Sequence, residues 1–410
     1  MTPPTASVVV VSRDRPEMLC RTVLSLRHLD HPAFEVVVVA DGPGLAALAR
    51  AGLDGPLKTA RRDEANISAA RNAGAALAAG EVVAFLDDDA VPEPTWLSRL
   101  TAPLAGDAVA ATGFVRGRNG ISLQWGAVEV DAGAGERPLP GAGTRLVPPR
   151  KGGAVKLHGT NMAVRREVLA RLGGFDPAYR FYLDDTDLAL RLAAAGASVA
   201  VVPGAEVHHA FAPSPRRGAG REPLSLTEIG ASLAVFLGRH APPEARAAAI
   251  DRQRRAEHDR LVRHLGAGRI GPKDVARLKG EFELGLAEGA ARPRPLLAPL
   301  PPPAEPFRLF PARTAPMRRL AGWTWQARRL RAEAAALVAG DTPVTLFLFG
   351  PTPRPHRLRF TEGGWWEQTG GLFGRADRSG PLLRPARFAT RLAEETRRLS
   401  AVRSFETRDP

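Results

Sequence analysis

The 410-residue sequence contains one cysteine, Cys20, which excludes an internal disulfide and a metal site with several cysteine ligands. No apolar run approaches the about 18 to 20 residues that a membrane span needs. The apolar run at 7–11 follows no basic segment, so it does not have the pattern of a secretory signal. Neither a glycine-rich P-loop nor a GxGxxG motif follows it, which argues against kinases and dinucleotide enzymes. The single cysteine, with no membrane span and no secretory signal, favours a reducing, cytoplasmic location.

Positive charge is concentrated in the C-terminal part of the sequence. Residues 1–240 carry 26 Lys and Arg against 25 Asp and Glu, whereas residues 241–410 carry 31 against 18. A basic surface of this kind favours an anionic partner, such as a membrane face, a polyanionic glycan or nucleic acid. The alternative is a tolerated basic surface in an arginine-rich protein. The two parts are therefore expected to have different roles.

Strand patterns alternate with helix patterns in the first part. Predicted strands lie at 7–11, 34–42, 81–89 and 199–211. Predicted helices lie at 16–27, 68–79, 161–172, 185–195 and 226–240. This order is typical of a doubly wound α/β sheet, in which ligands bind at the carboxyl ends of the strands. A glycine-rich excursion at 115–156, with a strand or two, contains Trp125, which could stack on a ligand ring or pack in a core.

Changes in composition divide the chain into four predicted units. They are a main α/β domain, a helical extension, a proline-rich linker and a basic C-terminal unit, at residues 1–240, 241–290, 291–316 and 317–410. The linker contains nine prolines in 26 positions and is expected to be extended. The C-terminal unit is predicted to start with a basic helix at 317–340. A small antiparallel β unit and a helix around 386–402 would follow.

Three consecutive carboxylates, Asp87, Asp88 and Asp89, end the predicted strand at 81–89. Because like charges repel and burial removes their hydration, a divalent cation is the usual compensation. Asp87 and Asp89 point to one side of an extended chain, and Asp88 points to the other. The pattern predicts a Mg²⁺ or Mn²⁺ site that would hold the phosphates of a nucleotide. The alternative is that Asp89 caps a helix that starts near Pro94.

Four motifs, in one order, resemble the family 2 glycosyltransferases of the GT-A fold. They are SVVVVSRDRPEML, VVVVADG, NISAARNAGAALAAGEVVAFLDDDAVPEPTWL and GTNMAVRREVLARLGGFDPAYRFYLDDTDLALRLAAAG. The resemblance covers residues 6–211. It implies a GT-A nucleotide-sugar-binding domain with a mixed, doubly wound sheet. It also implies an inverting, metal-dependent transfer of a sugar from a nucleotide-sugar donor.

The resemblance implies roles for five residues on the donor side. Ser12 takes the place of a threonine near the nucleobase, and Asp41 matches an aspartate that hydrogen-bonds the base, usually uracil. Arg71 would contact the nucleotide, Asp87 would lie near the ribose, and Asp89 would bind the metal. From the residues alone, Asp41 could be a turn residue in Asp-Gly-Pro-Gly, and Arg71 could belong to a surface ion pair.

On the acceptor side, the resemblance assigns the general base to Asp185, in the sequence DDTDL. Asp184 stands where a glutamate is commoner, and its shorter side chain is expected to alter acceptor choice. One of His208 and His209 would be a further metal ligand, because strand alternation lets only one of them face the site. The family pattern favours His209, and a shift of one residue would select His208. The alternative for the acids of DDTDL is that they cap the helix predicted at 185–195.

Processive relatives carry a QxxRW motif and membrane spans, and the sequence has neither, so transfer of one sugar or a few is expected. The predicted acceptor is a glycan or a lipid-linked sugar in envelope or surface polysaccharide synthesis. The basic segment 317–340, with Trp323 and Trp325, would lie on the inner membrane face as an interfacial helix, or pack against the main domain. No nucleic acid partner is expected.

Two other function classes stay open. A non-catalytic GT-A-like protein would bind glycans or a membrane surface, although clustered carboxylates without a use would cost stability. A nucleotidyltransferase also combines an α/β sheet with paired aspartates and Mg²⁺. It usually has a glycine-rich signature after the first strand, and SRDRPEM at 12–18 lacks the glycines.

Overall fold

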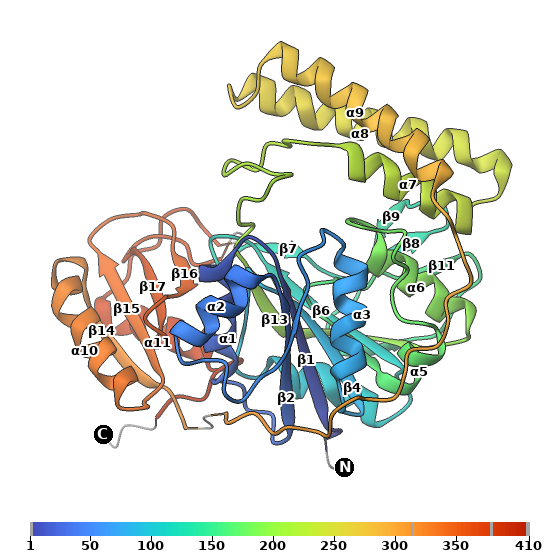
Figure 1. The fold of residues 1–410 in the computed structure, drawn as a ribbon. Helices are drawn as coiled ribbons and strands as arrows, with labels where there is room; N and C mark the ends of the chain where they lie inside the picture. Colours follow the sequence, from blue (N-terminus) through green and yellow to red (C-terminus); the bar gives the residue numbers. More distant parts are fainter. Residues whose placement is uncertain (1–2, 313–314, 378–379, 407–410) are drawn as a thin grey trace.

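A mixed ten-stranded sheet forms the centre of the molecule. The computed structural model describes residues 3–312, 315–377 and 380–406. The strands of this sheet are β1 (Ala6–Ser12), β2 (Phe34–Ala40), β3 (Lys58–Arg61), β4 (Val82–Asp87), β5 (Ala90–Pro92), β6 (Ala110–Arg116), β7 (Leu123–Trp125), β10 (Arg145–Val147), β12 (Met162–Arg165) and β13 (Val199–His209). Their order is β10-β13-β6-β12-β4-β1-β2-β3, with β5 paired to β13 and β7 paired to β6. Figure 1 shows β1, β2, β4, β6 and β13 at the centre of the molecule.

The strand directions bring two distant chain segments to one edge of the sheet. β1, β2, β3 and β4 are mutually parallel, and β13 is parallel to β6. β12 runs antiparallel between β4 and β6, so β4, β6 and β13 all point the same way. Asp87 at the end of β4 and His209 at the end of β13 therefore lie at the same edge. The predicted mixed α/β fold is confirmed.

Alternating valines give the central strands two apolar faces. Val8 and Val10 of β1 pack into one core and Val9 into the other. The first core is completed by α1 (Pro16–Leu26), α2 (Gly42–Arg50) and α4 (Trp96–Thr101), which the short 3-10 helix η1 (Ala102–Ala105) follows. The second is completed by α3 (Ile67–Leu77), α5 (Arg166–Arg171), α6 (Asp184–Ala194) and α7 (Thr227–His240). Burial on both faces is typical of parallel strands.

The excursion between β6 and β12 holds more strands than the one or two expected. β8 (Val128–Asp131), β9 (Glu136–Pro138) and β11 (Gly153–Val155) form a separate three-stranded sheet in the order β11-β8-β9. The helix predicted at 161–172 is wrong in its first part, because Met162–Arg165 is strand β12. Pairing with β4 and β6 on both sides buries this segment and overrides its helical spacing.

The helical extension is a hairpin of α8 (Pro243–Gly266) and α9 (Pro272–Ala291), and α9 packs closely on α7 (Figure 1). Glycines make this approach close enough. A Cβ added to Gly289 would lie 2.1 Å from the carbonyl oxygen of Ala231, and one added to Gly285 would lie 2.0 Å from that of Thr227. No larger residue fits at either position without separating the two helices.

The proline-rich segment is extended, but it is bound along the main domain. We call residues 292–312 the strap; they contain no helix or strand. The Leu300 N–H donates to the Ala170 carbonyl at 3.0 Å, and the Phe310 N–H donates to the Phe34 carbonyl at 2.8 Å. The Arg308 N–H donates at 2.9 Å to Glu35, whose carboxylate forms a fully buried ion pair with a lysine of β3. The strap therefore fixes the path of the chain across the base of the sheet.

The C-terminal unit differs from its prediction in two respects. Its elements are β14 (Arg318–Trp323), η2 (Thr324–Gln326), α10 (Ala327–Ala339), β15 (Val344–Gly350), β16 (Arg357–Phe360), β17 (Trp366–Gly371) and α11 (Phe388–Leu399). The predicted basic helix at 317–340 is wrong in its first part, because β14 pairs with β15. The sheet order is β14-β15-β17-β16, and only the β16–β17 pair is antiparallel. The predicted antiparallel unit is therefore mainly parallel.

Strand β14 also changes the surroundings of the two tryptophans. Trp323 stacks on Trp325 with ring centroids 4.9 Å apart, and it lies 4.8 Å from Phe388 of α11. The two rings are therefore not neighbours on one face of a membrane-bound helix, as an interfacial helix at 317–340 requires. Over the described ranges, we find no helix with the length and apolarity to cross a membrane.

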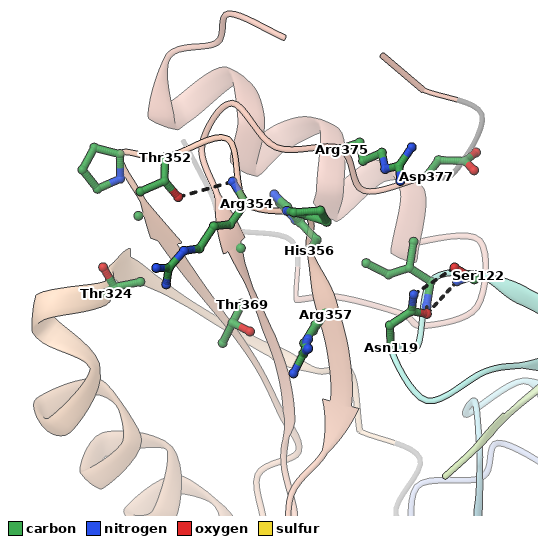
Figure 2. Close-up of a pocket in the computed structure, with 15 residues that line it drawn as sticks. Asn119, Ser122, Thr324, Thr352, Arg354, His356, Arg357, Thr369, Arg375 and Asp377 are labelled. Carbon is green, nitrogen blue, oxygen red and sulfur yellow. Dashed lines mark hydrogen bonds between the residues drawn. The ribbon is translucent and has the colours of Figure 1, made fainter. Parts of the chain in front are cut away.

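Two features of the contact between the C-terminal unit and the main domain bear on function. Arg403 donates two hydrogen bonds to Glu93, at 2.6 and 2.7 Å, and both side chains are fully buried. Burial alone would raise the pKa of Glu93, but Arg403 and His208 lower this pKa to about 2. The second feature is a pocket of about 780 Å³ at the carboxyl ends of β14, β15 and β17, bordered by residues 119–122 of the main domain (Figure 2).

Candidate active site

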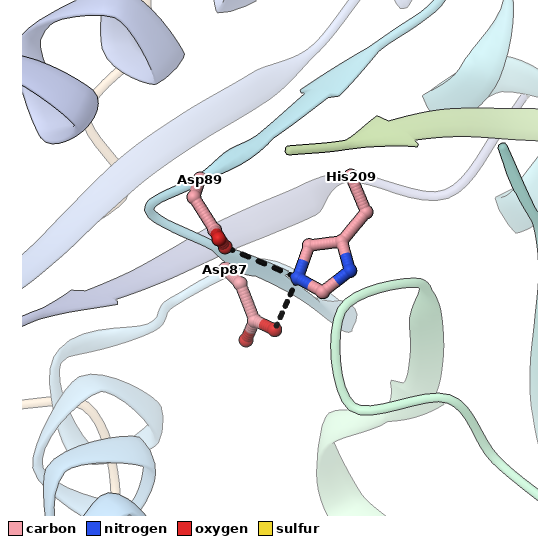
Figure 3. Close-up of side chains that lie close together, drawn as sticks. All are labelled: Asp87, Asp89 and His209. Carbon is pink, nitrogen blue, oxygen red and sulfur yellow. Dashed lines mark ion pairs between the residues drawn. The ribbon is translucent and has the colours of Figure 1, made fainter. Parts of the chain in front are cut away.

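Two aspartates and a histidine meet at the carboxyl edge of the central sheet. Asp87, Asp89 and His209 each offer a ligand atom, and these atoms lie within 4.8 Å of one another. His209 Nε2 is 3.2 Å from Asp89 Oδ1 and 4.0 Å from Asp87 Oδ2. Figure 3 shows both carboxylates directed at this ring nitrogen. We call these three residues the acidic cluster.

Strand pairing explains why this histidine and not its neighbour belongs to the cluster. β5 follows the turn after β4 and pairs antiparallel with β13, which sets His209 opposite Ala90. Alternation turns His208 to the other side, where its Nε2 lies 2.7 Å from Glu93 Oε1 and its ring meets the edge of Trp366. The structure therefore places His209 beside the aspartates and His208 in the contact with the C-terminal unit.

The acidic cluster has the donor set of a divalent cation site. Carboxylate oxygens suit Mg²⁺ and Mn²⁺, and an imidazole nitrogen suits Mn²⁺. Asp89 Oδ2 accepts a hydrogen bond from the Ala212 N–H at 2.7 Å and lies 3.2 Å from Arg15, which leaves Oδ1 directed at the cluster. Burial alone would raise the pKa of Asp89, but His209 and Arg15 hold this pKa below its usual range. The alternative that Asp89 caps a helix is wrong, because α4 begins at Trp96.

Asp88 faces away from the cluster, as strand alternation predicts. Its carboxylate accepts a hydrogen bond from the Ser12 hydroxyl at 2.7 Å and lies 2.6 Å from Arg15. Burial raises the pKa of Asp88 to about 7, against the attraction of Arg15. Ser12, which the resemblance puts near a nucleobase, is therefore engaged with the strand end. Sequence reasoning gave Arg15 no role, although it lies in the loop after β1 and contacts two of the three consecutive aspartates.

Arg71 connects the donor-side and acceptor-side acids. Its guanidinium pairs with Asp184, lies 3.2 Å from Asp87 Oδ1, and donates to the Gly159 carbonyl at 3.0 Å. Arg71 and Asp184 are 3% and 4% exposed, so they form no surface ion pair. Burial raises the pKa of Asp184 to about 6, despite Arg71. The structure does not bring Asp184 to an open acceptor side, because its carboxylate is enclosed against Arg71.

Asp185 lies in the first turn of α6, after a tight turn. Tyr182 and Leu183 have left-handed backbones, with φ of 73° and 64°. The carboxylate of Asp185 is half-buried and accepts hydrogen bonds from the Gly159 N–H at 2.8 Å and the Thr186 hydroxyl at 3.1 Å. Gly159 thus contacts both Asp185 and Arg71, which links Asp185 to Asp87.

Asp41 is the N-terminal cap of α2. Its carboxylate accepts from the Gly44 N–H of α2 at 3.0 Å and from the Asp14 N–H at 2.8 Å, and it is 5% exposed. The structural alternative considered from the sequence was a turn residue, whereas the structure makes Asp41 the N-cap of α2. It also ties the loop after β1 to the end of β2. Hydrogen bonding of a nucleobase by Asp41 stays a prediction.

Aromatic rings and arginines line the site beside His209. Trp125 stacks on His158 with ring centroids 5.7 Å apart and lies 5.5 Å from the His209 ring. The Phe211 ring lies 4.3 Å from His209, with the guanidinium of Arg221 4.2 Å above its face. Sequence reasoning considered Trp125 as a stacking residue but missed Phe211 and Arg221. The available signal was the arginine-rich, glycine-rich composition of 212–223, directly after the paired histidines.

The site thus combines an acidic cluster with a nearby half-buried carboxylate, Asp185, at the carboxyl edge of a mixed α/β sheet. Residues 7–173 match the sequence model described as glycosyl transferase family 2. This match confirms the resemblance to family 2 glycosyltransferases over these residues.

Known proteins resemble parts of the chain. It is 30% identical over 209 residues to the O-antigen biosynthesis protein RfbC of Myxococcus xanthus, covering 48% of this chain and 16% of that one. It is 41% identical over 87 residues to the N-acetylglucosaminyl-diphospho-decaprenol L-rhamnosyltransferase of Mycobacterium tuberculosis, covering 21% and 27%. The chain thus spans less than a third of the length of either relative. A mannosyltransferase structure from Pyrobaculum calidifontis, in complex with GDP-Man and Mn²⁺, matches with a TM-score of 0.43 and 19% identity, covering 70% of this chain and 87% of that one.

Proposed function

We propose that this protein is a metal-dependent, inverting glycosyltransferase. It would move one sugar from a nucleoside-diphosphate sugar, UDP-linked in the leading case, to a hydroxyl of a glycan or lipid-linked acceptor. The observation that carries the proposal is the acidic cluster of Asp87, Asp89 and His209, linked through Arg71 and Gly159 to Asp185. A non-catalytic binding protein would not need this connected set of charges.

Each residue has a distinct part in the proposed reaction. Asp89 and His209, with Asp87, would hold Mn²⁺ or Mg²⁺, which when bound supplies positive charge for the leaving diphosphate. Arg71 would orient Asp87 toward the donor. Asp185 would accept the proton of the acceptor hydroxyl as that oxygen attacks the sugar from the opposite face. The Gly159 N–H holds one carboxylate oxygen of Asp185, which leaves the carboxylate oriented with lone pairs available.

The acceptor proposal rests on the relatives. RfbC is named for O-antigen biosynthesis, and the mycobacterial relative is named for an acceptor sugar on a decaprenyl diphosphate. A lipid-linked sugar in envelope or surface polysaccharide synthesis is the corresponding acceptor here. Work on such an acceptor would require peripheral contact with a membrane, and the basic C-terminal part of the chain is the proposed surface for it.

The test is isothermal titration of UDP, GDP and dTDP, with and without Mn²⁺, on the wild type, Asp89→Ala and Asp185→Asn. We expect one diphosphate to bind more tightly with Mn²⁺ than without it, and we expect this Mn²⁺-dependent binding to be lost in Asp89→Ala. Asp185→Asn should bind the same diphosphate normally, because it leaves the acidic cluster intact. Its sugar transfer should fall by about 10² to 10⁴, the usual contribution of a general base.

Asp54→Ala is the matched control, because Asp54 is an exposed aspartate of the same domain. It should behave like the wild type in both assays. Unchanged metal-dependent binding in Asp89→Ala would contradict the metal site, and wild-type transfer by Asp185→Asn would contradict the base. If the folded wild type binds no diphosphate at all, the non-catalytic alternative replaces this proposal.

A further inference from the structure

A second concave site lies in the C-terminal unit, away from the acidic cluster. Its pocket of about 780 Å³ opens at the carboxyl ends of the parallel strands β14, β15 and β17, near Thr324, Gly350 and Gly370. This is the end at which open parallel sheets bind ligands. The volume falls in the range of about 300 to 1,000 Å³ usual for small-molecule sites.

The main domain provides one wall of the pocket. Asn119, Ile121 and Ser122, from the segment between β6 and β7, lie on it. The Leu358 N–H donates to the Asn119 carbonyl at 2.9 Å, and the Asn119 side chain accepts from the Ile121 and Ser122 N–H groups. The pocket therefore has a fixed wall on each side and forms only when the two parts of the chain are together.

Positive charge dominates the lining. Arg354, Arg357 and Arg375 face one pocket, with Asp377 as the one acid among the lining residues. Within the described ranges, no ion pair is recorded for any of these three guanidinium groups. Elsewhere in the same unit, Arg318, Arg331 and Arg398 each have a carboxylate partner. Three arginines without such a partner, at one cavity, are an arrangement that an anion would stabilise.

Hydroxyl groups complete the polar lining. Figure 2 shows Arg354 near Thr324 of η2 and Thr369 of β17. The floor is rigid: His356 is 2% exposed, and its Nε2 lies 2.9 Å from the Gly371 carbonyl. Forked guanidinium groups and hydroxyls around a rigid floor match the tetrahedral oxygens of a phosphate better than a neutral sugar.

We propose that this pocket is a binding site for a small phosphorylated molecule, of the size of a sugar phosphate or a diphosphate. Arg354, Arg357 and Arg375 bind its phosphate oxygens, and the threonine hydroxyls bind its remaining polar groups. The site is separate from the acidic cluster and needs no divalent cation. It gives a specific role to part of the excess positive charge of residues 241–410.

The test uses the Asp89→Ala protein in EDTA, so that the acidic cluster binds no metal. Pyrophosphate, glucose 1-phosphate, glucuronate and methyl glucoside are titrated calorimetrically. We expect saturable binding of the two phosphates and little binding of the carboxylate or the neutral sugar. Arg354→Ala and Arg357→Ala should each weaken phosphate binding about tenfold or more, because each removes a charge-assisted contact. Both side chains are exposed, so the variants should fold normally.

Arg328→Ala is the matched control, since Arg328 is an exposed arginine of the same unit outside the pocket. It should bind phosphates like its parent. Equal binding by the pocket variants and this control would overturn the proposal, and so would equal binding of glucuronate and glucose 1-phosphate. Co-sedimentation with phosphatidylglycerol vesicles, without binding of any free probe, would also overturn it and assign these arginines to a membrane surface. None of these results depends on sugar transfer.

Discussion

The buried Arg403–Glu93 pair offers the sharpest test of how the C-terminal unit supports the active site. Arg403→Met removes the charge and keeps much of the apolar side-chain volume. Glu93 would then be a buried carboxylate that has lost both hydrogen bonds from the guanidinium. Breaking a buried pair from one side costs about 3 to 5 kcal/mol. The free energy of unfolding should fall by that amount.

Urea denaturation followed by tryptophan fluorescence measures this loss, because the Arg403 guanidinium lies 3.8 Å from the centre of the Trp366 ring. The double variant Glu93→Gln, Arg403→Met removes both charges. It should cost less than the sum of the two single variants, by at least about 1 kcal/mol. Arg318→Met is the control, because its pair with Glu406 is partly exposed and should contribute no more than about 1 kcal/mol.

The same variant should affect the acidic cluster. His208 Nε2 lies 2.7 Å from Glu93 Oε1, and His208 directly precedes His209. Loss of Arg403 removes two hydrogen bonds from Glu93 and should shift His208. We expect this shift to displace the adjacent His209 and weaken Mn²⁺ binding. The reasoning is refuted if Arg403→Met costs no more stability than Arg318→Met and leaves the affinity for Mn²⁺ unchanged.

Two further predictions concern packing and pH. Gly289→Ala should destabilise the protein by about 1 to 3 kcal/mol, because its Cβ would lie 2.1 Å from the Ala231 carbonyl oxygen. Gly280→Ala, in open space on the same helix, should stabilise the protein by up to about 1 kcal/mol. Thermal unfolding compares the two variants, and stability changes of the same sign would contradict the close helix contact. Burial lowers the pKa of His31 to about 4, so its contribution to stability is present above about pH 6.5 and is lost as the pH falls toward 4. His31→Asn, which does not titrate, should lose about 1 to 3 kcal/mol less than the wild type between those pH values in urea titrations, and equal losses would contradict the assignment.

Local pattern was enough to predict strands β1, β2, β4 and β13 of the central sheet. The valine runs of β1 and β2 and the carboxylates at the end of β4 have the same meaning in the structure as in the sequence. It failed where a partner strand decides the conformation. Arg318–Trp323 and Met162–Arg165 have helix-compatible residues, yet each pairs with a neighbouring strand, and pairing outweighs a weak intrinsic preference.

For the site as well, local pattern predicted some features, and contacts between distant residues decided the others. Strand alternation predicted that Asp87 and Asp89 share a side and that Asp88 does not, and the geometry has that arrangement. The sequence could not show that Arg71 is enclosed between Asp87 and Asp184, because those acids are brought together by a helix and a strand nearly a hundred residues apart. Nor could it show that Asp41 caps a helix while holding the loop that contains Asp14.

The contact between Arg403 and Glu93 can form only late in the synthesis of the chain. The two residues are 310 positions apart. At about 5 to 20 residues per second, a ribosome needs roughly 15 to 60 s to make the chain between them. Throughout that interval the emerging sheet carries Glu93 without its guanidinium, and the end of β13 lacks its support. The edge of the sheet that carries the acidic cluster therefore lacks this contact until the end of synthesis, although Asp87, Asp89 and His209 are made in the first part or the middle of the chain.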